Sequence, residues 1–279
     1  MTPDLLSLVL PLRALEAGPP EGQTLPRWWG RAAHALFLKA VAEQDPALAR
    51  RLHDDDGPRP FTASSLIGPT RGGRLDPEAV YRLRFTALTA EVAQALQAAR
   101  ASGLLAPGRQ VVLAGMPFEV LPAEALGETP DPWQAATTYQ ALSADLLTAR
   151  AAPARAWTLL FASPTTFHVA GRHMPFPMPA WVFGSLLARW NAFAPVTFPP
   201  EARRYAEEVL AVTRYQLSTR AVPLKEGALR IGAVGRVTYR ALSYDRYWMS
   251  VMEVLARFAL FAGVGAGTAY GLGQVRWEE

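Results

Sequence analysis

With 279 residues, 50% of them hydrophobic, and a formal net charge of +4, the chain is long enough for two modest domains or one large one and too apolar to be disordered. It contains no cysteine, which excludes disulfides, thiolate zinc sites, iron–sulfur ligation and cysteine nucleophiles. No segment reaches the roughly 18 consecutive apolar residues that a membrane helix needs, and we expect a cytoplasmic protein that does not contact a membrane.

The first part of the chain alternates between strand and helix patterns. The apolar run 4–13 lacks the basic start and the cleavage site of a signal peptide and predicts a strand, and apolar residues at helical spacing in 31–44 predict a helix. The alternation of Tyr81, Leu83 and Phe85 with arginines predicts another strand. The other expected elements are a short helix from Asp45-Pro46, a strand at 59–68, a helix at 90–103 with Thr89 as its N-cap, and a strand at 108–121.

This β-α-β-β-α-β order is that of the ferredoxin-like fold, in which two helices cover one face of an antiparallel sheet and leave the other face free for a partner. After a boundary at 127–132, the second half approximates the same order. Its expected elements are helices at 133–150, 179–193, 201–209 and 244–265, and extended segments at 155–167, 211–222, 228–242 and 272–277. We therefore predict an α+β protein of tandem ferredoxin-like (RRM-like) domains, with the first domain at 1–127 and the second at 133–279.

A glycine-rich segment runs from Gly263 to Gly273, before the last predicted strand. Glycines at this density allow positive φ angles and close approach of another chain, and successive free N–H groups in such a bend bind anions, phosphate above all. The segment lacks the lysine and the hydroxyl residue of a P-loop, and it lacks the Gly-x-Gly-x-x-Gly spacing of a dinucleotide site. The alternative is a permissive helix-to-strand connection that binds nothing.

The glycine pattern and two further motifs resemble those of one known family. A Gly-x-Gly pair, five residues and a second Gly-x-Gly pair before a C-terminal strand resemble the Cas6 family of CRISPR repeat endoribonucleases, in the RAMP superfamily; the second pair is Gly271 and Gly273, and the register of the first pair is ambiguous. The segment 161–193, with Ser163-Pro164-Thr165 and Arg189-Trp190-Asn191, looks like another motif of that family, and Leu52-His53 with Pro60-Phe61-Thr62 looks like a third.

The resemblance implies tandem ferredoxin-like domains, an arginine-rich cleft and cleavage of precursor CRISPR RNA within its repeats, with no metal ion and no cofactor. In the implied reaction a ribose 2′-hydroxyl attacks the adjacent phosphate and leaves a 5′-hydroxyl on one product. The implied partner is CRISPR repeat RNA. Membership of a CRISPR effector complex and a homodimer remain open, as do the repeat sequence, the CRISPR subtype and whether a hairpin or a single strand is recognised.

The implied reaction needs a proton acceptor, a proton donor and cations for the phosphorane charge. By the resemblance, the catalytic histidine lies in the first helix, which selects His34, with Lys39 about one turn beyond it. Many family members have a tyrosine upstream of this histidine, whereas the first tyrosine here is Tyr81; Arg27 is the candidate for the vacant role. The alternative is a histidine at the boundary of an amphipathic helix. His53, His168 and His173 are taken as loop or surface residues.

Arginine supplies nearly all the positive charge, since only Lys39 and Lys225 among the 28 basic residues are lysines. Arginine suits phosphate and stacked bases, but a GC-rich genome is the simpler explanation. In the segment 228–242 three arginines are separated by even numbers of residues, so one face of a strand could carry all three and bind RNA. The alternative is an exposed strand face that arginine keeps soluble. The predicted RNA-binding residues are Gly263, Gly265, Gly267, Thr268, Gly271, Gly273, Arg230, Arg236, Tyr239 and Arg240.

Three hypotheses of function follow. The first is an active repeat endoribonuclease with His34, Arg27 and Lys39 as catalytic residues and no metal site. The second is a non-catalytic RNA-binding subunit of the same superfamily, which the missing upstream tyrosine keeps open. The third is a scaffold protein whose basic surface meets a protein partner.

Overall fold

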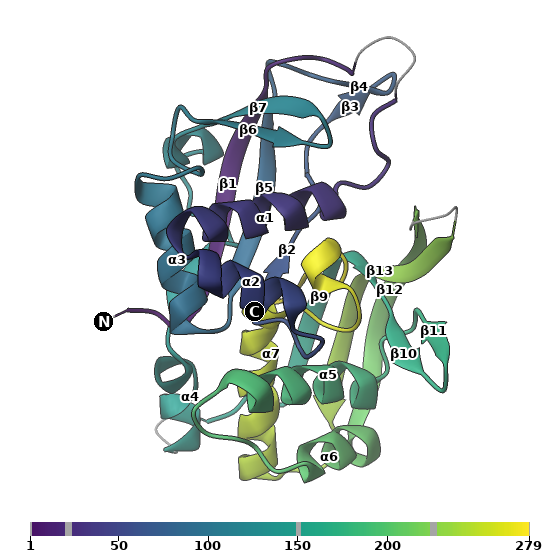
Figure 1. Ribbon diagram of the computed structural model, residues 1–279. Coiled ribbons are helices and arrows are strands. Elements are labelled where there is room, and N and C mark those ends of the chain that lie inside the picture. Colours follow the sequence, from purple (N-terminus) through teal and green to yellow (C-terminus); the bar gives the residue numbers. More distant parts are fainter. Residues whose placement is uncertain (1, 20–23, 149–151, 224–227, 279) are drawn as a thin grey trace. The chain divides into compact units, whose positions relative to one another are not determined.

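A computed structural model describes residues 2–19, 24–148, 152–223 and 228–278 (Figure 1). The chain divides into two compact units: unit 1 consists of Met1–Ala136 with Ala269–Gly271, and unit 2 of Thr137–Thr268 with Leu272–Glu279. The division falls after Ala136, a few residues beyond the boundary at 127–132 that the composition indicates. Each unit contains an antiparallel sheet with helices, which confirms the predicted α+β class with tandem ferredoxin-like domains.

Unit 1 has a main sheet with the strand order β2-β5-β1-β7-β6, and β8 pairs with β1 outside this path. In chain order its elements are β1 (Leu5–Ala14), α1 (Gly30–Gln44), α2 (Pro46–Asp54), β2 (Phe61–Ala63), β3 (Thr70–Arg71), β4 (Arg74–Leu75), β5 (Val80–Ala87), α3 (Ala90–Ala101), β6 (Gln110–Leu113), β7 (Met116–Val120), the 3-10 turn η1 (Ala123–Leu126) and β8 (Ala135–Thr137). The sequence β1-α1-β2-β5-α3-β7 is the ferredoxin-like order, with β6 added as a hairpin partner of β7.

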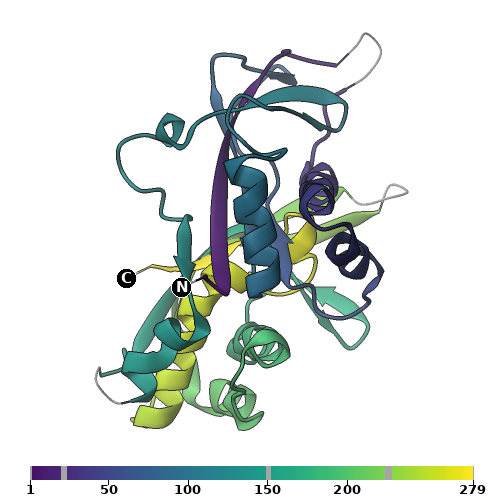
Figure 2. The ribbon, with the colours of Figure 1, turned by 60° about the vertical axis from the view of Figure 1, so that its left-hand side comes forward.

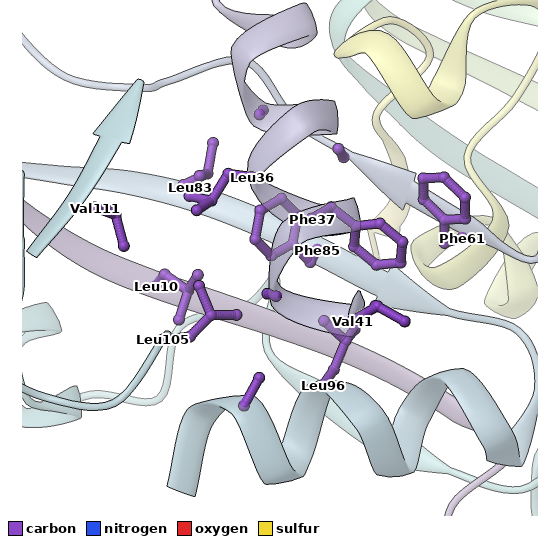
Figure 3. Close-up of a cluster of buried hydrophobic side chains, with 14 of the residues drawn as sticks. Leu10, Leu36, Phe37, Val41, Phe61, Leu83, Phe85, Leu96, Leu105 and Val111 are labelled. Carbon is purple, nitrogen blue, oxygen red and sulfur yellow. The ribbon is translucent and has the colours of Figure 1, made fainter. Parts of the chain in front are cut away.

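The core of unit 1 lies between the sheet and the helices α1 and α3, which Figures 1 and 2 show on the same face. Figure 3 shows Phe37 of α1 and Leu96 of α3 pointing toward Leu10 and Phe85 of the sheet, and all four side chains have 0% exposure. Burial of one such side chain contributes about 1.5–3 kcal/mol. The apolar residues at helical spacing in α1 therefore hold the helix that carries His34 against the sheet.

The opposite face of this sheet is covered as well. Arg84 of β5 is buried, with its guanidinium 4.7 Å from the centre of the Trp133 ring and its Nη1 3.1 Å from the Ser7 hydroxyl. Burial lowers the pKa of Arg84 to about 9, an effect that Asp131 opposes. The prediction of a free second face is thus wrong around Arg84, because the segment that contains Asp131 and Trp133 folds back over it. Arg82, two residues away on the same strand face, is exposed.

Several element boundaries differ from those the sequence predicts. The strand expected at 108–121 is the hairpin β6–β7, which turns at Ala114 (φ 49°) and Gly115 (φ 82°). The strand expected at 59–68 is regular only over β2, and the helix expected at 133–150 begins at Tyr139 after β8, with residues 149 and 150 outside the described part. Thr89 occupies the N-cap position of α3 but makes no side-chain capping bond, whereas Asp45 caps α2.

Unit 2 has a sheet with the strand order β12-β13-β9-β14 and a separate two-stranded hairpin, β10–β11. Its elements are α4 (Tyr139–Leu147), β9 (Ala156–Thr165), β10 (Phe167–Val169), β11 (Arg172–Met174), α5 (Pro179–Phe193), α6 (Glu201–Val209), β12 (Leu210–Pro223), β13 (Leu229–Ala241), α7 (Arg246–Ala262) and β14 (Val275–Glu278), and a 3-10 turn η3 (Thr268–Tyr270) lies between the last two. The order β9-α5-β12-β13-α7-β14 repeats the ferredoxin-like pattern, and Trp157, Phe183 and Phe258 are fully buried in this unit.

None of the helices in the described ranges is long and apolar enough to cross a membrane.

Candidate functional site

His34 lies in the first half of α1 and is half-buried. Its Nδ1 atom is 3.2 Å from the carbonyl oxygen of Ala269, a residue of the glycine-rich segment that belongs to unit 1. A carbonyl oxygen can only accept a hydrogen bond, so the neutral imidazole carries its hydrogen on Nδ1. This contact leaves the lone pair on Nε2, which is then the nitrogen that can take up a proton.

Two aromatic rings lie beside the imidazole. The centre of the Tyr270 ring is 4.4 Å from that of His34, with 33° between the ring planes, and the Phe61 ring is 5.5 Å away. Tyr270 is 42% exposed, whereas Phe61 is buried and stacks on Phe37 of α1 at 3.9 Å. The imidazole therefore lies against one buried and one partly exposed aromatic side chain.

The surroundings of His34 favour its neutral form. Burial lowers the pKa of the imidazole below its usual value of 6.5, the hydrogen bond to Ala269 raises it, and the positive charges of Arg59 and His53 lower it further. The net shift is downward because removal of the imidazolium from water outweighs the single hydrogen bond. A neutral imidazole at pH 7 with a free Nε2 is suited to act as a general base.

The other two predicted catalytic residues are exposed. Lys39 lies five residues after His34 on α1, which places it about 140° around the helix axis at about 3.6 residues per turn. Arg31, three residues before His34, shares its helix face and is also exposed. Arg27 is exposed and precedes the helix. The roles of Arg27 and Lys39 stay predictions, and the helix geometry favours Arg31 over Lys39 as the neighbour of His34.

The segment Ala269–Gly271 is held within unit 1 by residues that the sequence motifs did not single out. The indole Nε1 of Trp28 donates a hydrogen bond of 2.7 Å to the Tyr270 carbonyl oxygen. A Cβ atom on Gly30 would lie only 1.8 Å from that oxygen, so the first residue of α1 must be glycine. Gly271 is buried and forms a parallel bridge with Ser64. The only signal in the sequence was the Trp28-Trp29-Gly30 run before the helix.

The glycines of the glycine-rich segment have the positive φ angles that the sequence predicts. Gly263, Gly265, Gly267 and Gly273 have φ angles of 62°, 78°, 76° and 64°, and Gly271 of unit 1 has 91°. Gly263, Thr268 and Gly273 are buried, and Gly265 and Gly267 are half-buried. Direct RNA contacts by these residues stay a prediction, and the buried ones offer RNA little surface.

The expected concavity of successive free N–H groups does not form over most of the segment. The amide of Gly265 donates to the Ser185 hydroxyl over 2.9 Å, and that of Ala266 donates to the Thr166 carbonyl over 2.9 Å. The amide of Val264 donates to Gly273, whose own amide donates to Pro164. These N–H groups donate within unit 2 because the segment packs against the end of β9 and against α5. The prediction that free N–H groups bind phosphate is therefore wrong over Gly263–Ala266 and at Gly273.

The family motifs of the second half hold this segment in place. The guanidinium of the half-buried Arg189 donates to the carbonyl oxygens of Ala262 (2.8 Å) and Gly265 (3.5 Å). Burial lowers the pKa of Arg189 to about 10, so it stays charged at pH 7. On the other side, the Ser163 hydroxyl accepts a 2.9 Å bond from the amide of Gln274.

The other two residues of the Arg-Trp-Asn motif fold the chain that leaves α5. The carboxamide of Asn191 makes two bonds of 2.8 Å to the backbone of Phe198, one to its carbonyl oxygen and one from its amide. Trp190 donates to the Val196 carbonyl oxygen and stacks on the Phe198 ring at 4.8 Å. These motif residues are therefore parts of the scaffold of unit 2.

The predicted RNA-binding role of Tyr239 is wrong. Its side chain is fully buried, its hydroxyl donates to the Pro177 carbonyl oxygen over 2.8 Å, and its ring packs on Phe183. Successive residues of a strand point to opposite faces, so Tyr239 points into the core while Arg236 and Arg240 on either side are exposed.

The three arginines of β13 have different surroundings. Arg236 forms a two-pronged ion pair with Glu278, with Nε 2.6 Å from Oε2 and Nη2 3.3 Å from Oε1, and this partner raises its pKa. Arg240 is exposed. Arg230 is half-buried, and an irregularity in the pairing with β9 at Ala233–Gly235 separates it from the other two. The even spacing in sequence therefore does not by itself place Arg230 on the strand face that carries Arg236 and Arg240.

The remaining histidines lie elsewhere on the surface. His53 lies in the last turn of α2, and its Nδ1 is 2.9 Å from the Asp54 carboxylate. His168 and His173 face each other across the β10–β11 hairpin with ring centres 5.3 Å apart. In the described ranges no cluster of three or more His, Cys, Asp or Glu residues could hold a metal ion.

The chain is similar to known Cas6 proteins over its whole length. The family model described as "CRISPR-associated endoribonuclease Cas6" matches residues 159–275. The Cas6 endoribonuclease of Streptococcus thermophilus is 25% identical over 134 residues, which span 44% of this chain and 51%, about half, of that relative. A solved Cas6 product complex is 30% identical, with 99% of both chains covered and a TM-score of 0.72, and a Cas6 of Thermus thermophilus is 26% identical, with 100% of both covered and a TM-score of 0.71.

The shared fold, the full-length coverage at 30% identity and the matched family model agree. The chain belongs to the Cas6 family of CRISPR-associated endoribonucleases.

Proposed function

We propose that this chain cleaves precursor CRISPR RNA within its repeats, without a metal ion, and that His34 is the general base. One observation carries the proposal within unit 1: in a member of an endoribonuclease family, Nδ1 of His34 lies 3.2 Å from the Ala269 carbonyl oxygen, which leaves the lone pair on Nε2. Burial, which lowers the pKa of His34, favours the neutral form that a general base needs. RNA as the partner is supported by related Cas6 proteins that were solved as product and substrate-mimic complexes.

In the proposed reaction, Nε2 of His34 takes the proton of the ribose 2′-hydroxyl. The oxygen attacks the adjacent phosphorus, and the bond from phosphorus to the 5′-oxygen breaks. That oxygen takes up a proton, so the products are a cyclic phosphate and a 5′-hydroxyl. Arg27, Arg31 and Lys39 are the nearby cations in sequence that could oppose the charge on the phosphorane, since preorganised positive groups stabilise charge that develops in a transition state.

The test is cleavage of a cognate repeat RNA in EDTA, with analysis of the product ends. We expect the wild-type chain to cut and to leave a 5′-hydroxyl, and we expect His34→Ala to lose activity by about 10²-fold to 10⁴-fold, the usual contribution of general base catalysis. His168→Ala is the matched control, because it removes an exposed histidine of the β10–β11 hairpin in unit 2. Full activity of His34→Ala, or loss of wild-type activity in EDTA, would overturn the mechanism.

A non-catalytic RNA-binding subunit is the second candidate. The absence of any tyrosine before Tyr81 favours it, because that tyrosine is part of the pattern that the family resemblance implies. Tight binding of repeat RNA with no cleavage under any condition would support this reading. Failure to bind repeat RNA at low salt, where phosphate contacts are strongest, would instead favour a scaffold that meets a protein partner.

A further inference from the structure

A tyrosine lies beside His34 in the structure, although no tyrosine precedes Tyr81 in the sequence. Tyr270 of the glycine-rich segment lies with its ring centre 4.4 Å from that of His34, although the two residues are near opposite ends of the sequence. The neighbouring Ala269 supplies the carbonyl oxygen that binds Nδ1. Two consecutive residues of one segment thus contact the same imidazole, one through its backbone and the other through its ring.

We propose that Tyr270 is a positioning residue for His34, which together with the Ala269 carbonyl holds the imidazole with Nε2 free and correctly aimed. This inference rests on the proposed function of His34. A single hydrogen bond at Nδ1 still allows the imidazole to tilt about the bond. The Tyr270 ring, which packs against the imidazole with 33° between the planes, restricts that tilt, because aromatic pairs prefer a narrow range of separations and angles.

The backbone of Tyr270 is itself fixed, so its ring is a firm support. Trp28 donates to the Tyr270 carbonyl oxygen, Gly30 leaves room for that oxygen, and the following residue, Gly271, is bridged to Ser64. A Cβ atom on Gly271 would lie 2.8 Å from the Trp28 ring. The close fit between Trp28 and this segment therefore explains why glycine occurs both at the start of α1 and directly after Tyr270.

The ring, rather than the hydroxyl, carries the proposed role. The Tyr270 ring itself lies against the imidazole, with 33° between the ring planes, and the 42% exposure of the residue keeps part of the side chain in solvent. The charged groups that act on His34 are Arg59 and His53. Replacement of the ring should therefore alter the orientation of the imidazole without removing a charge.

The experiment compares Tyr270→Phe and Tyr270→Ala in single-turnover cleavage of repeat RNA, with Tyr244→Ala, an exposed tyrosine of unit 2, as the control. We expect Tyr270→Ala to slow the cleavage step by about 10-fold to 100-fold, the usual effect of a small misplacement of a catalytic group, with RNA affinity unchanged. Tyr270→Phe and Tyr244→Ala should stay within about 3-fold of wild type, since neither removes the ring that packs against His34.

A second readout does not depend on cleavage. The ¹⁵N chemical shifts of the His34 ring in the RNA-free protein report its tautomer, and we expect the Nδ1–H form in the wild type and in Tyr270→Phe. Tyr270→Ala should show a mixture of tautomers. Trp28→Phe, which removes the donor to the Tyr270 carbonyl oxygen, should give a smaller change in the same direction and provides a second variant if Tyr270→Ala does not fold.

The outcomes separate this inference from the proposed function. A wild-type chain that never cleaves would remove the proposed function, while the ring shifts would still test the positioning role. Cleavage that depends on His34 but is unaffected in Tyr270→Ala, with an unchanged tautomer, would overturn the inference alone. Equal losses in Tyr270→Phe and Tyr270→Ala, or a loss confined to RNA affinity, would also overturn it, because the hydroxyl or an RNA contact would then be responsible.

Discussion

The guanidinium of Arg189 donates a hydrogen bond of 2.8 Å to the carbonyl oxygen of Ala262, the last residue of α7. A helix leaves its final carbonyl groups without partners in the helix, and here a residue of α5 supplies one. The same side chain reaches the Gly265 carbonyl oxygen. Arg189 therefore fixes the path by which the chain leaves α7 and enters the glycine-rich segment.

Arg189→Ala should destabilise the protein by about 1.5–3 kcal/mol, because it leaves two carbonyl oxygens without a charged donor in a buried place. The matched control is Arg204→Ala, which breaks a surface pair with Glu208 in α6 and should change stability by less than about 1 kcal/mol. Thermal or urea unfolding measures both variants. Equal effects of the two substitutions would show that the Arg189 bonds contribute little.

The glycine at position 265 is required for two separate reasons. Its φ angle is 78°, and an added Cβ would lie 2.4 Å from the Thr166 carbonyl oxygen. Gly171, in the β10–β11 turn, has a φ of 75° and open space around the added Cβ. Gly171→Ala should therefore cost only the backbone strain, about 1–2 kcal/mol, whereas Gly265→Ala adds a steric conflict of about 1–3 kcal/mol.

Unfolding measurements on both glycine variants separate the cost of backbone strain from the cost of the steric conflict, because the two glycines have nearly the same φ angle. Similar losses for Gly265→Ala and Gly171→Ala would mean that the Thr166 segment moves aside without cost. We also expect Gly265→Ala, and not Gly171→Ala, to impair RNA cleavage, since only Gly265 lies in the segment that continues to Ala269 and Tyr270.

Local patterns predicted the regular elements of the chain well and its turns less well. The alternation of Tyr81, Leu83 and Phe85 corresponds to β5, and the helical spacing in 31–44 corresponds to α1. The β6–β7 hairpin was missed because its turn is Ala114-Gly115, whereas a turn with two positive φ angles normally contains Asn-Gly or Asp-Gly. An alanine at φ 49° gives no such signal in the sequence.

The candidate site was predictable only in part, for a similar reason. The position of His34 on a helix follows from local periodicity, but its contact with Tyr270 joins two distant segments, and no period of 2 or 3.6 residues reports such a contact. The burial of Tyr239 could have been deduced, since a period of two places it opposite Arg236 and Arg240. The ion pair of Arg236 with Glu278, from another strand, could not.

That ion pair leads to a prediction about RNA affinity. Arg240 is exposed, whereas the charge of Arg236 is already matched by Glu278. If RNA lies along this strand face, Arg240→Ala should lower the slope of log affinity against log salt by about 0.7–0.9, the contribution of one phosphate contact. Arg236→Ala should lower it less. Binding titrations at several salt concentrations measure both slopes, and a larger effect of Arg236→Ala would show that RNA displaces Glu278.

The lowered pKa of His34 predicts how stability and activity depend on pH. Burial places the pKa of His34 in the folded protein below its unfolded value of 6.5. At a pH between these two pKa values, His34 of the unfolded chain binds more protons than His34 of the folded chain. The free energy of unfolding therefore falls as the pH drops below about 6.5 and is fully regained above it. His34→Asn can keep a donor near the Ala269 carbonyl oxygen but cannot titrate, so it should lack this part of the pH dependence.

Unfolding of the wild type and His34→Asn between about pH 5 and pH 8 tests this sign, because the difference between the two isolates one residue. We expect the wild type to lose stability relative to His34→Asn as the pH is lowered. We expect kcat/KM for RNA cleavage to decline on the acid side only at a pH below 6.5, because the base of the folded enzyme becomes protonated at its lowered pKa. A wild type that gains relative stability in acid would mean that the imidazolium is the favoured form in the folded protein. His34 would then be poised to donate a proton rather than to accept one.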